Sequence, residues 1–385
     1  MKKAVDIIRK NTMLIVLVLV VLFFAAMTKG QMVSAANFTA LISQNAYVFI
    51  LATGMLMCML TGGNIDLSVG SVVCFIGAVG GTMMVTKGWP VPLAILMMIV
   101  VGIIYGLILG YLIAYLNIPP WIATLAGMLA LRGWGVAIMK GLTISPLPDS
   151  FVKMFNGSVP DVLGGSDLNL TCVVAGAVVS ILFILLQMKT RTDRIKKGYE
   201  IESMISMIVR LVLTCAVIML FAIKMAQKNG IPFALLWVAV ICLVYNFITS
   251  KTTIGRYFYT IGGNEAATRL SGIDTKKIYF LAYVNMAFLS TIAAMMTMAR
   301  NTSATPTAGT NFEMDAISAC VVGGVSAYGG AGTVFGMVIG ATLIGVINLG
   351  MSVMGIDANY QKVVKGLVLL FAVVFDLLNK KDSRA

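Results

Sequence analysis

Long apolar runs recur along this chain, and they constrain its fold more than any other feature. A helix that crosses the hydrocarbon core of a bilayer needs about 20 mostly apolar residues. Lipid offers no partners for backbone groups, so such runs predict spanning helices rather than open sheets. We predict twelve candidate spans, at residues 12–28, 43–60, 68–86, 90–116, 121–139, 169–188, 205–223, 231–249, 279–299, 314–328, 332–354 and 361–378.

The third and tenth candidate spans are glycine-rich or short, so we expect some of the helices to be broken or re-entrant. The count of spanning helices is therefore about ten to twelve. The predicted fold is all-α and polytopic, with residues 1–385 forming one transmembrane domain.

Composition supports this class and argues against others. The chain is 59% hydrophobic and 11% charged, whereas soluble domains are about 45–50% apolar and about 25% charged. The net charge of +13 is explained by basic cytoplasmic loops, so we predict no nucleic-acid partner. Histidine is absent, and the six cysteines fall within apolar runs without metal-ligand spacing, so we predict no metal site and no cofactor.

The distribution of Lys and Arg predicts the orientation. Twelve spans with both termini in the cytoplasm give the inside segments roughly twice as many Lys and Arg as the outside segments. The inside residues include Lys2, Lys3, Arg9 and Lys10 before the first span, five between 189 and 197, five between 251 and 277, and Lys380, Lys381 and Arg384 after the last span. This model places a loop at 140–168 outside and a loop at 251–278 inside.

The stretch "TGGNIDLSVGS" (61–71) interrupts apolar sequence with a carboxylate and several glycines. A buried carboxylate is costly unless it finds water, a partner or backbone donors. Asp66 has two interpretations: it caps the start of the third span, or it lines or gates a path. Both roles are compatible, because broken helix ends are where transporters place polar contacts. A second glycine-rich stretch, "VGGVSAYGGAGT" (322–333), is compatible with a repeat of parallel orientation.

The predicted cytoplasmic loop contains a short helix with clear boundary signals. Asn264 is a good N-cap, Glu265 lies in the first turn, and Gly272 suits the residue after the helix. The helix is either a rigid knob that enters a partner's groove or an amphipathic segment that rests on lipid headgroups. The chain has no GxxxxGK[ST] phosphate loop, and no HExxH or GxSxG motif. We therefore expect no ATPase or hydrolase activity of its own.

Four motifs together resemble the monosaccharide permeases of bacterial ABC importers, of the ribose, xylose and galactose type. They are "TGGNIDLSVGS", "IPPWIATLAGM", "GRYFYTIGGNEAATRLSGI" and "CVVGGVSAYGGAGTVFGMVIGA". The length is closer to the xylose and multiple-sugar permeases than to the ribose type. The additional residues lie around 189–250, which we interpret as a family-variable insertion.

The resemblance implies a multi-pass permease of the bacterial cytoplasmic membrane that moves a pentose or hexose by alternating access. It implies three protein partners: a second permease subunit (a homodimer in the simplest case), an ABC ATPase and an extracytoplasmic sugar-binding protein. It assigns the short cytoplasmic helix to coupling with the ATPase, at Gly263, Asn264, Glu265, Ala266, Ala267, Arg269, Leu270, Ser271 and Gly272. From polarity and glycine spacing, candidate path residues are Asn64, Asp66, Ser68, Thr124 and Ser326.

The alternative is an ion-coupled secondary carrier or channel for small polar solutes. Such carriers usually embed several acids as ion or proton sites. Few ionisable residues lie within the apolar runs, and histidine is absent, which makes this class less attractive.

Overall fold

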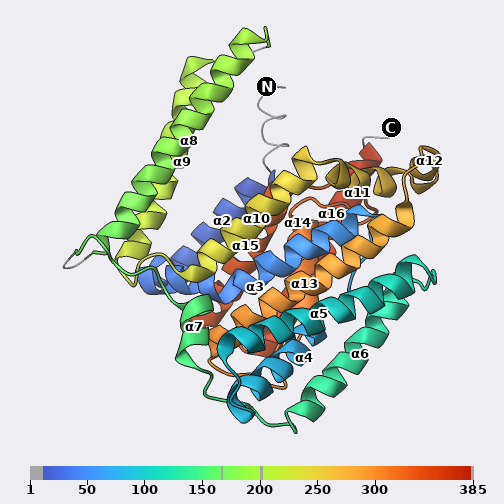
Figure 1. Ribbon diagram of the computed structural model, residues 1–385. Coiled ribbons are helices and arrows are strands. Elements are labelled where there is room, and N and C mark those ends of the chain that lie inside the picture. Colours follow the sequence, from blue (N-terminus) through green and yellow to red (C-terminus); the bar gives the residue numbers. More distant parts are fainter. Residues whose placement is uncertain (1–11, 166–167, 200–202, 383–385) are drawn as a thin grey trace.

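The computed structural model describes residues 12–165, 168–199 and 203–382, and the chain is built from helices over these ranges (Figure 1). The helices are α2 (Thr12–Met27), η1 (Gln31–Val33), α3 (Ala35–Leu60), α4 (Val69–Gly81), the π-helical turn η2 (Thr82–Thr86), α5 (Val91–Ala114), α6 (Pro120–Ile138), α7 (Asp149–Asn156), α8 (Leu170–Lys196), α9 (Met204–Ala226), α10 (Phe233–Lys251), α11 (Thr253–Gly263), α12 (Glu265–Leu270), α13 (Thr275–Asn301), α14 (Phe312–Val322), α15 (Val334–Val353) and α16 (Ala358–Asp382).

The prediction of an all-α polytopic membrane protein is confirmed. Within the described ranges, nine helical segments are long and apolar enough to cross a membrane: α3, α4 with η2, α5, α6, α8, α9, α10, α13 and α15. Three predicted spans fall outside this group. The first is α2, which has 16 residues; the tenth is α14, which has 11; the last is α16, with 25.

The centre of the bundle is the packed pair α3 and α13 (Figure 1). α3 is buried continuously from Ile50 to Leu60. Small residues let the neighbouring helices approach closely, as is usual in lipid, where no hydrophobic force drives helices together. Gly102, Gly106 and Gly110 line the face of α5 that contacts α13, and a Cβ on any of them would crowd an α13 residue.

A short helix, as predicted for the tenth span, is found at α14, whereas α4 continues through η2 as one helical segment, Val69–Thr86, that is long enough to span. With 11 residues, α14 is about 16 Å long, roughly half the ~30 Å hydrocarbon core. Each of these two helices follows a non-helical segment that enters the bundle, 61–68 before α4 and 302–311 before α14. The two segments meet, because Gly70 packs backbone to backbone against Gly309.

Two stretches share the same element order, and their long helices run in opposite directions: α3 ends at Leu60 against Gly262 of α11, whereas α13 begins shortly after α12, which follows α11. One is α3, the 61–68 segment, α4 and α5; the other is α13, the 302–311 segment, α14 and α15. This order is that of an inverted-topology repeat, in which broken helices meet near the middle of the membrane. The glycine-rich stretch 322–333, which the sequence suggests as the counterpart of 61–71, instead follows α14.

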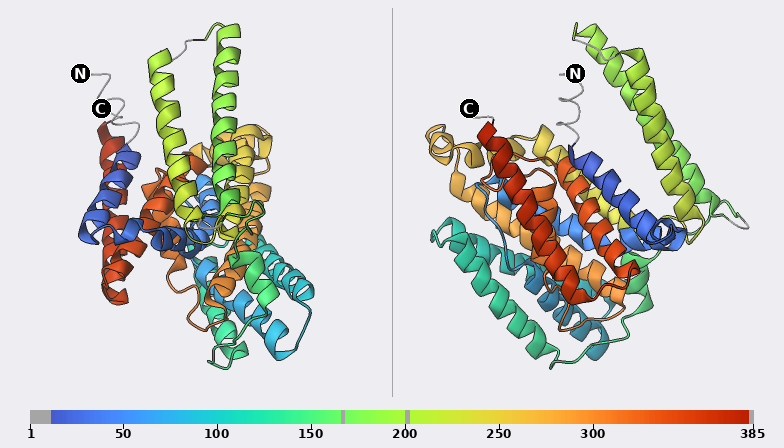
Figure 2. Two further views of the ribbon diagram at one scale, coloured as in Figure 1. Left: turned by 90° about the vertical axis from the view of Figure 1, so that its left-hand side faces the viewer. Right: turned by 180° about the vertical axis from the view of Figure 1, so that it is seen from behind.

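Helices α8 and α9 form a hairpin that projects away from the bundle (Figures 1 and 2). Its attachment lies near the ends at Leu170 and Ala226, where Phe221 makes an edge-to-face contact with Phe38 of α3 at 4.5 Å between ring centroids. The projecting unit is therefore 170–226, whereas α10 packs against α3 in the bundle. That 189–250 is a family-variable insertion stays a prediction.

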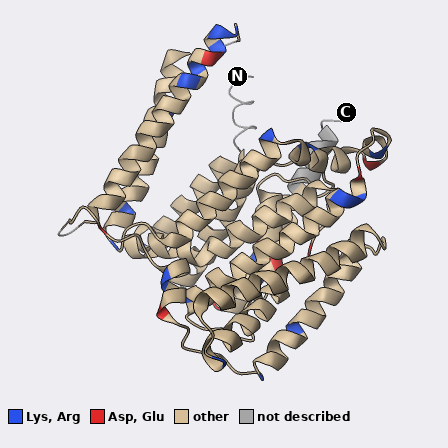
Figure 3. Ribbon diagram, in the orientation of Figure 1, with Lys and Arg blue, Asp and Glu red and all other residues tan. Residues whose placement is uncertain are grey.

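The two ends of the bundle differ, and we name them the α12 side and the α7 side. The start of α2, the end of α16 and the free end of the α8–α9 hairpin all lie toward the α12 side (Figure 2). Charged residues gather at the ends of helices, and most of the bundle's length is uncharged (Figure 3). The basic residues at 2–10 and Arg384 lie outside the described residues.

The predicted loop at 140–168 contains one short helix. Residues Asp149–Asn156 form α7, which buries Phe151 and Phe155 one turn apart. Phe155 stacks on Trp237 of α10, with 5.5 Å between ring centroids. The i, i+4 pair of aromatics and an acid in the first turn were local signals for this helix.

Candidate translocation and coupling sites

The predicted short helix exists as α12, and its boundary signals act as expected. The Asn264 side chain accepts a hydrogen bond from the Ala267 N–H at 3.0 Å, which caps the first turn. Gly272 has φ +82°, the left-handed conformation that glycine adopts without strain. Leu270 at the end of the helix is 89% exposed. A capped, rigid turn thus presents an apolar side chain at the surface of the α12 side.

Glycine backbones connect α12 to the two glycine-rich reversals. Gly262, at the end of α11, lies directly on the Leu60 carbonyl and on Gly330. The Gly330 N–H in turn donates to the Leu60 carbonyl at 3.1 Å, and Gly329 packs on Gly62. Because no side chain separates these segments, a displacement of α11 and α12 must shift both reversals. We call this contact the glycine junction.

A groove of about 450 Å³ lies beside α12. Glu265 of α12, Tyr279 of α13 and Asn64 of the 61–68 segment line it. The Tyr279 hydroxyl donates to the Glu265 carboxylate at 2.9 Å, and Asn64 lines the same groove. Tyr279 is thus bonded to the short helix and lies in one groove with the segment that leads into α4.

Asp66 and Ser68 are buried where the 61–68 segment reaches α4. The Asp66 carboxylate accepts from the Ser68 N–H at 2.8 Å and from the Ser68 hydroxyl at 2.6 Å. It thus closes a turn around Ser68, the residue before α4, whose own side chain makes no cap hydrogen bond. That Asp66 caps the helix stays a prediction. Arg132 of α6 donates to the Pro306 and Ala308 carbonyls at 3.2 and 2.6 Å, and so fixes the 302–311 segment.

Of the five candidate path residues, Asp66 and Ser68 are hydrogen-bonded to each other, and Gly63, next to Asn64, packs on the Ala327 carbonyl, next to Ser326. Thr124 is buried and donates to the Pro120 carbonyl at 2.9 Å. Ser326 is buried in the reversal between α14 and α15. The linings of the two polar hollows described here include Asn64 but not Asp66, Ser68, Thr124 or Ser326. A role for these residues in the path stays a prediction.

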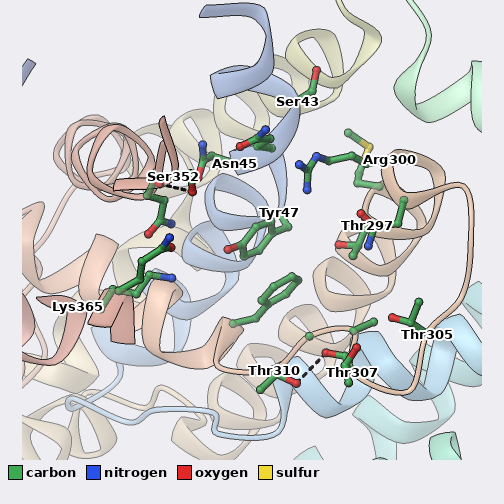
Figure 4. Close-up of a pocket in the computed structure, with 18 residues that line it drawn as sticks. Ser43, Asn45, Tyr47, Thr297, Arg300, Thr305, Thr307, Thr310, Ser352 and Lys365 are labelled. Carbon is green, nitrogen blue, oxygen red and sulfur yellow. Dashed lines mark hydrogen bonds between the residues drawn. The ribbon is translucent and has the colours of Figure 1, made fainter. Parts of the chain in front are cut away.

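A second polar hollow, of about 390 Å³, is lined by residues that include Arg300 and Asn301 at the end of α13 (Figure 4). Its walls are the first half of α3, the end of α13, the 302–311 segment, and the facing ends of α15 and α16. Hydroxyl and amide side chains dominate the lining, which includes Ser43, Gln44, Asn45, Thr297, Asn301, Thr305, Thr307, Thr310, Asn348, Ser352 and Gln361. We call it the polar cavity.

Tyr47 lies in the middle of the polar cavity, between Arg300 on one side and Lys365 on the other (Figure 4). Its ring stacks on Phe312 with 3.7 Å between centroids. Its hydroxyl donates to Asp315 at 2.7 Å, and the Lys365 ammonium lies 2.8 Å from the other Asp315 oxygen. The Asp315 carboxylate is thus neutralised by Lys365 and orients Tyr47, which ties α3, α14 and α16 together.

Sequence reasoning missed the polar cavity because its residues are far apart in the chain. Tyr47 and Asp315, for example, are separated by 268 positions. One signal was present: polar residues such as Asn45, Asn348 and Lys365 interrupt apolar runs, and each is costly in lipid without a polar surrounding.

Comparison with known proteins identifies relatives over almost the whole chain. Residues 37–373 match the family model described as "Branched-chain amino acid transport system / permease component". The xylose transport system permease protein XylH of Haemophilus influenzae is 37% identical over 96% of both chains. XylH of Escherichia coli K12 is 35% identical over 96% of this chain and 92% of its own length. The ribose import permease protein RbsC of H. influenzae is 31% identical over 93% of this chain and 90% of its own. No solved structure matches the chain.

Proposed function

The chain belongs to the family described as the permease component of branched-chain amino acid transport systems, and from that premise we propose that it is the permease of an ATP-driven monosaccharide importer. It moves a pentose or hexose from an extracytoplasmic binding protein into the cytoplasm by alternating access. The observation that carries this proposal is the 37% identity over 96% of both chains with a xylose transport permease. As a member of a transport family, the chain is a translocation subunit rather than an enzyme.

The lining of the polar cavity favours a sugar over a branched-chain amino acid as the cargo. An aliphatic side chain is best bound by an apolar pocket. The walls of the polar cavity instead consist largely of hydroxyl and amide groups, which match the alternating donors and acceptors of a polyhydroxylated solute.

The energy comes from a separate ABC ATPase that binds α12 and the groove beside it. The exposed Leu270 and the capped turn suit insertion into a partner's groove. ATP-driven closure of the ATPase pushes α12, and the glycine junction carries that displacement to the segments that lead into α4 and out of α14.

The partners and the orientation follow from this assignment. The α12 side faces the cytoplasm and the α7 side faces the binding protein, in a bacterial cytoplasmic membrane. A second copy of this chain completes the translocation unit, so that two ATPase subunits act on two α12 helices.

A transport assay in cells tests this function. The gene is deleted, and uptake of radiolabelled D-xylose and D-ribose is measured with and without a plasmid copy. We expect uptake of at least one neutral monosaccharide to depend on the chain. That sugar is D-xylose, D-ribose, or another monosaccharide identified because it competes with the labelled sugars. Unchanged uptake of every monosaccharide, together with loss of branched-chain amino acid uptake, would contradict the proposal.

A further inference from the structure

We infer that the polar cavity is a monosaccharide-binding site of the translocation cycle, which the sugar occupies when the permease is open toward the α7 side. The inference rests on the proposed function, because it names where on this chain the sugar is held.

The position of the polar cavity is the first argument. Its walls come from the α7-side ends of α13, α15 and α16, and it reaches inward to Phe312 and Gly309, where α14 begins beside α4. It therefore connects the face predicted to receive the sugar with the contact between α4 and the segment before α14. A volume of about 390 Å³ lies within the range of about 300–1,000 Å³ that is typical of small-molecule sites.

The chemistry of the lining is the second argument. Neutral hydroxyl and amide groups form most of the wall, and the stacked Tyr47 and Phe312 rings add an apolar surface for sugar C–H groups. The Asn348 amide oxygen is buried and has no hydrogen-bond partner among the described residues. That oxygen is shielded from the hollow in this conformation, so the groups offered to a sugar are the other hydroxyl and amide side chains of the lining.

One of the two cations of the site is neutralised, since Lys365 is compensated by Asp315 at 2.8 Å. The Arg300 guanidinium is a donor for hydroxyl oxygens. This set of charges can accept a neutral sugar, and the sugar-acid comparison below tests that choice. The Tyr47–Asp315 hydrogen bond and the stacked Phe312 ring lie on the wall that adjoins α14.

Neighbouring positions on α16 allow a matched test. Gln361 lines the polar cavity, whereas Tyr360 is 69% exposed and is not part of the lining. Gln361→Cys and Tyr360→Cys are each incorporated into the complete importer in proteoliposomes. Both are treated with a bulky, membrane-impermeant methanethiosulfonate from the α7 side. The wild-type importer is treated in parallel to measure how far modification of the native cysteines lowers transport. Ser352→Cys, a nearly isosteric change on another wall, is a second cavity probe.

We expect modification of Gln361→Cys and Ser352→Cys to lower D-xylose transport about tenfold or more, because the added group occupies the volume that the sugar needs. We expect modification of Tyr360→Cys to leave transport within about twofold of the untreated level. D-Xylose in excess should slow modification at the cavity positions and not at Tyr360→Cys, since occupancy by the ligand protects its site.

Three results would overturn the inference: full transport after complete modification of both cavity positions, equal protection at Tyr360→Cys, or protection by a sugar acid but not by neutral sugars. These results differ from failure of the proposed function. In that case the untreated importer would not transport any monosaccharide.

Discussion

At the scale of single residues, glycines place backbones in direct contact where the moving parts meet. Gly70 and Gly309 face one another where α4 and the segment before α14 meet, and a Cβ on either would overlap the other's carbonyl oxygen. Protein interiors are densely packed, so two backbone segments in such direct contact shift together.

Gly70→Ala should destabilise the protein, whereas Gly133→Ala should not. Both glycines are helical, so both gain helix propensity of up to about 1 kcal/mol. Only Gly70 is crowded, and overpacking costs about 1–3 kcal/mol or more. A Cβ at Gly133 would have no heavy atom within 4 Å. Thermal unfolding of the purified chain measures the difference; equal unfolding temperatures would contradict the assigned contact.

Asp161 organises the α7-side loop through its carboxylate. It accepts from the Gly165, Leu170 and Thr171 N–H groups and from the Thr171 hydroxyl. These hydrogen bonds hold the pKa of the Asp161 carboxyl well below its ordinary value. The bond from Gly165 has the largest effect, followed by those from Thr171 and Leu170.

This lowered pKa predicts the pH dependence of the loop. The ionised Asp161 carboxylate stabilises the loop at pH values above its unfolded-state pKa of about 3.9. This stabilisation is lost as the pH falls through the lower pKa of the folded state. Asp161→Asn should raise protease cleavage within 160–171 at neutral pH, to a level that wild type reaches only in acid. Proteolysis followed by mass spectrometry measures this, and equal cleavage of variant and wild type at neutral pH would refute it.

At the scale of elements, α12 depends on its end residues. Glu265→Arg removes the acceptor for Tyr279 and places a cation at the positive end of the helix, which costs about 0.3–1 kcal/mol. Gly272→Pro cannot adopt φ +82°. Both variants should insert normally but lose co-purification with the ATPase. Normal sugar transport by both would count against coupling through α12.

Tyr279 and Tyr283 form a matched pair one turn apart on α13. The Tyr279 hydroxyl bonds to Glu265, whereas the buried Tyr283 hydroxyl has no hydrogen-bond partner among the described residues. Tyr279→Phe should leave ATPase binding intact but lower the sugar moved per ATP hydrolysed about fivefold, the range of a 1 kcal/mol coupling energy. Tyr283→Phe should leave this ratio unchanged. The same ratio in both variants would exclude Tyr279 from coupling.

The elements differ in how far the sequence predicts them, for a physical reason. The α12 helix is fixed by local signals, the Asn264 cap and Gly272, so it is predictable from a short window. The shortness of α14 was visible in the glycine-rich stretch that interrupts the apolar run at 322–333. The polar cavity is not predictable in this way, since Tyr47, Phe312, Asn348 and Lys365 meet only after α3, α14, α15 and α16 have packed.

At the scale of the whole molecule, the stretches α3–α5 and α13–α15 provide a mechanism for alternating access in a chain without a phosphate-loop motif. Each contributes a long helix, an entering segment and the helix that follows it, and Gly70 of α4 meets Gly309 of the segment before α14. The polar cavity lies on one side of this meeting point and the glycine junction on the other. Motion of α12 can therefore change the contact between Gly70 and Gly309 and alternate access to the cavity.

The central claim is that this chain supplies the path while a partner supplies the energy. Reconstitution in sealed proteoliposomes tests it most directly, with sugar accumulation and ATP hydrolysis measured for the purified chain alone and then with the ATPase and binding protein added. We predict neither activity for the chain alone, with or without an ion gradient, and ATP-dependent accumulation for the assembled system. Accumulation by the chain alone under an ion gradient would instead identify a secondary carrier and contradict the account.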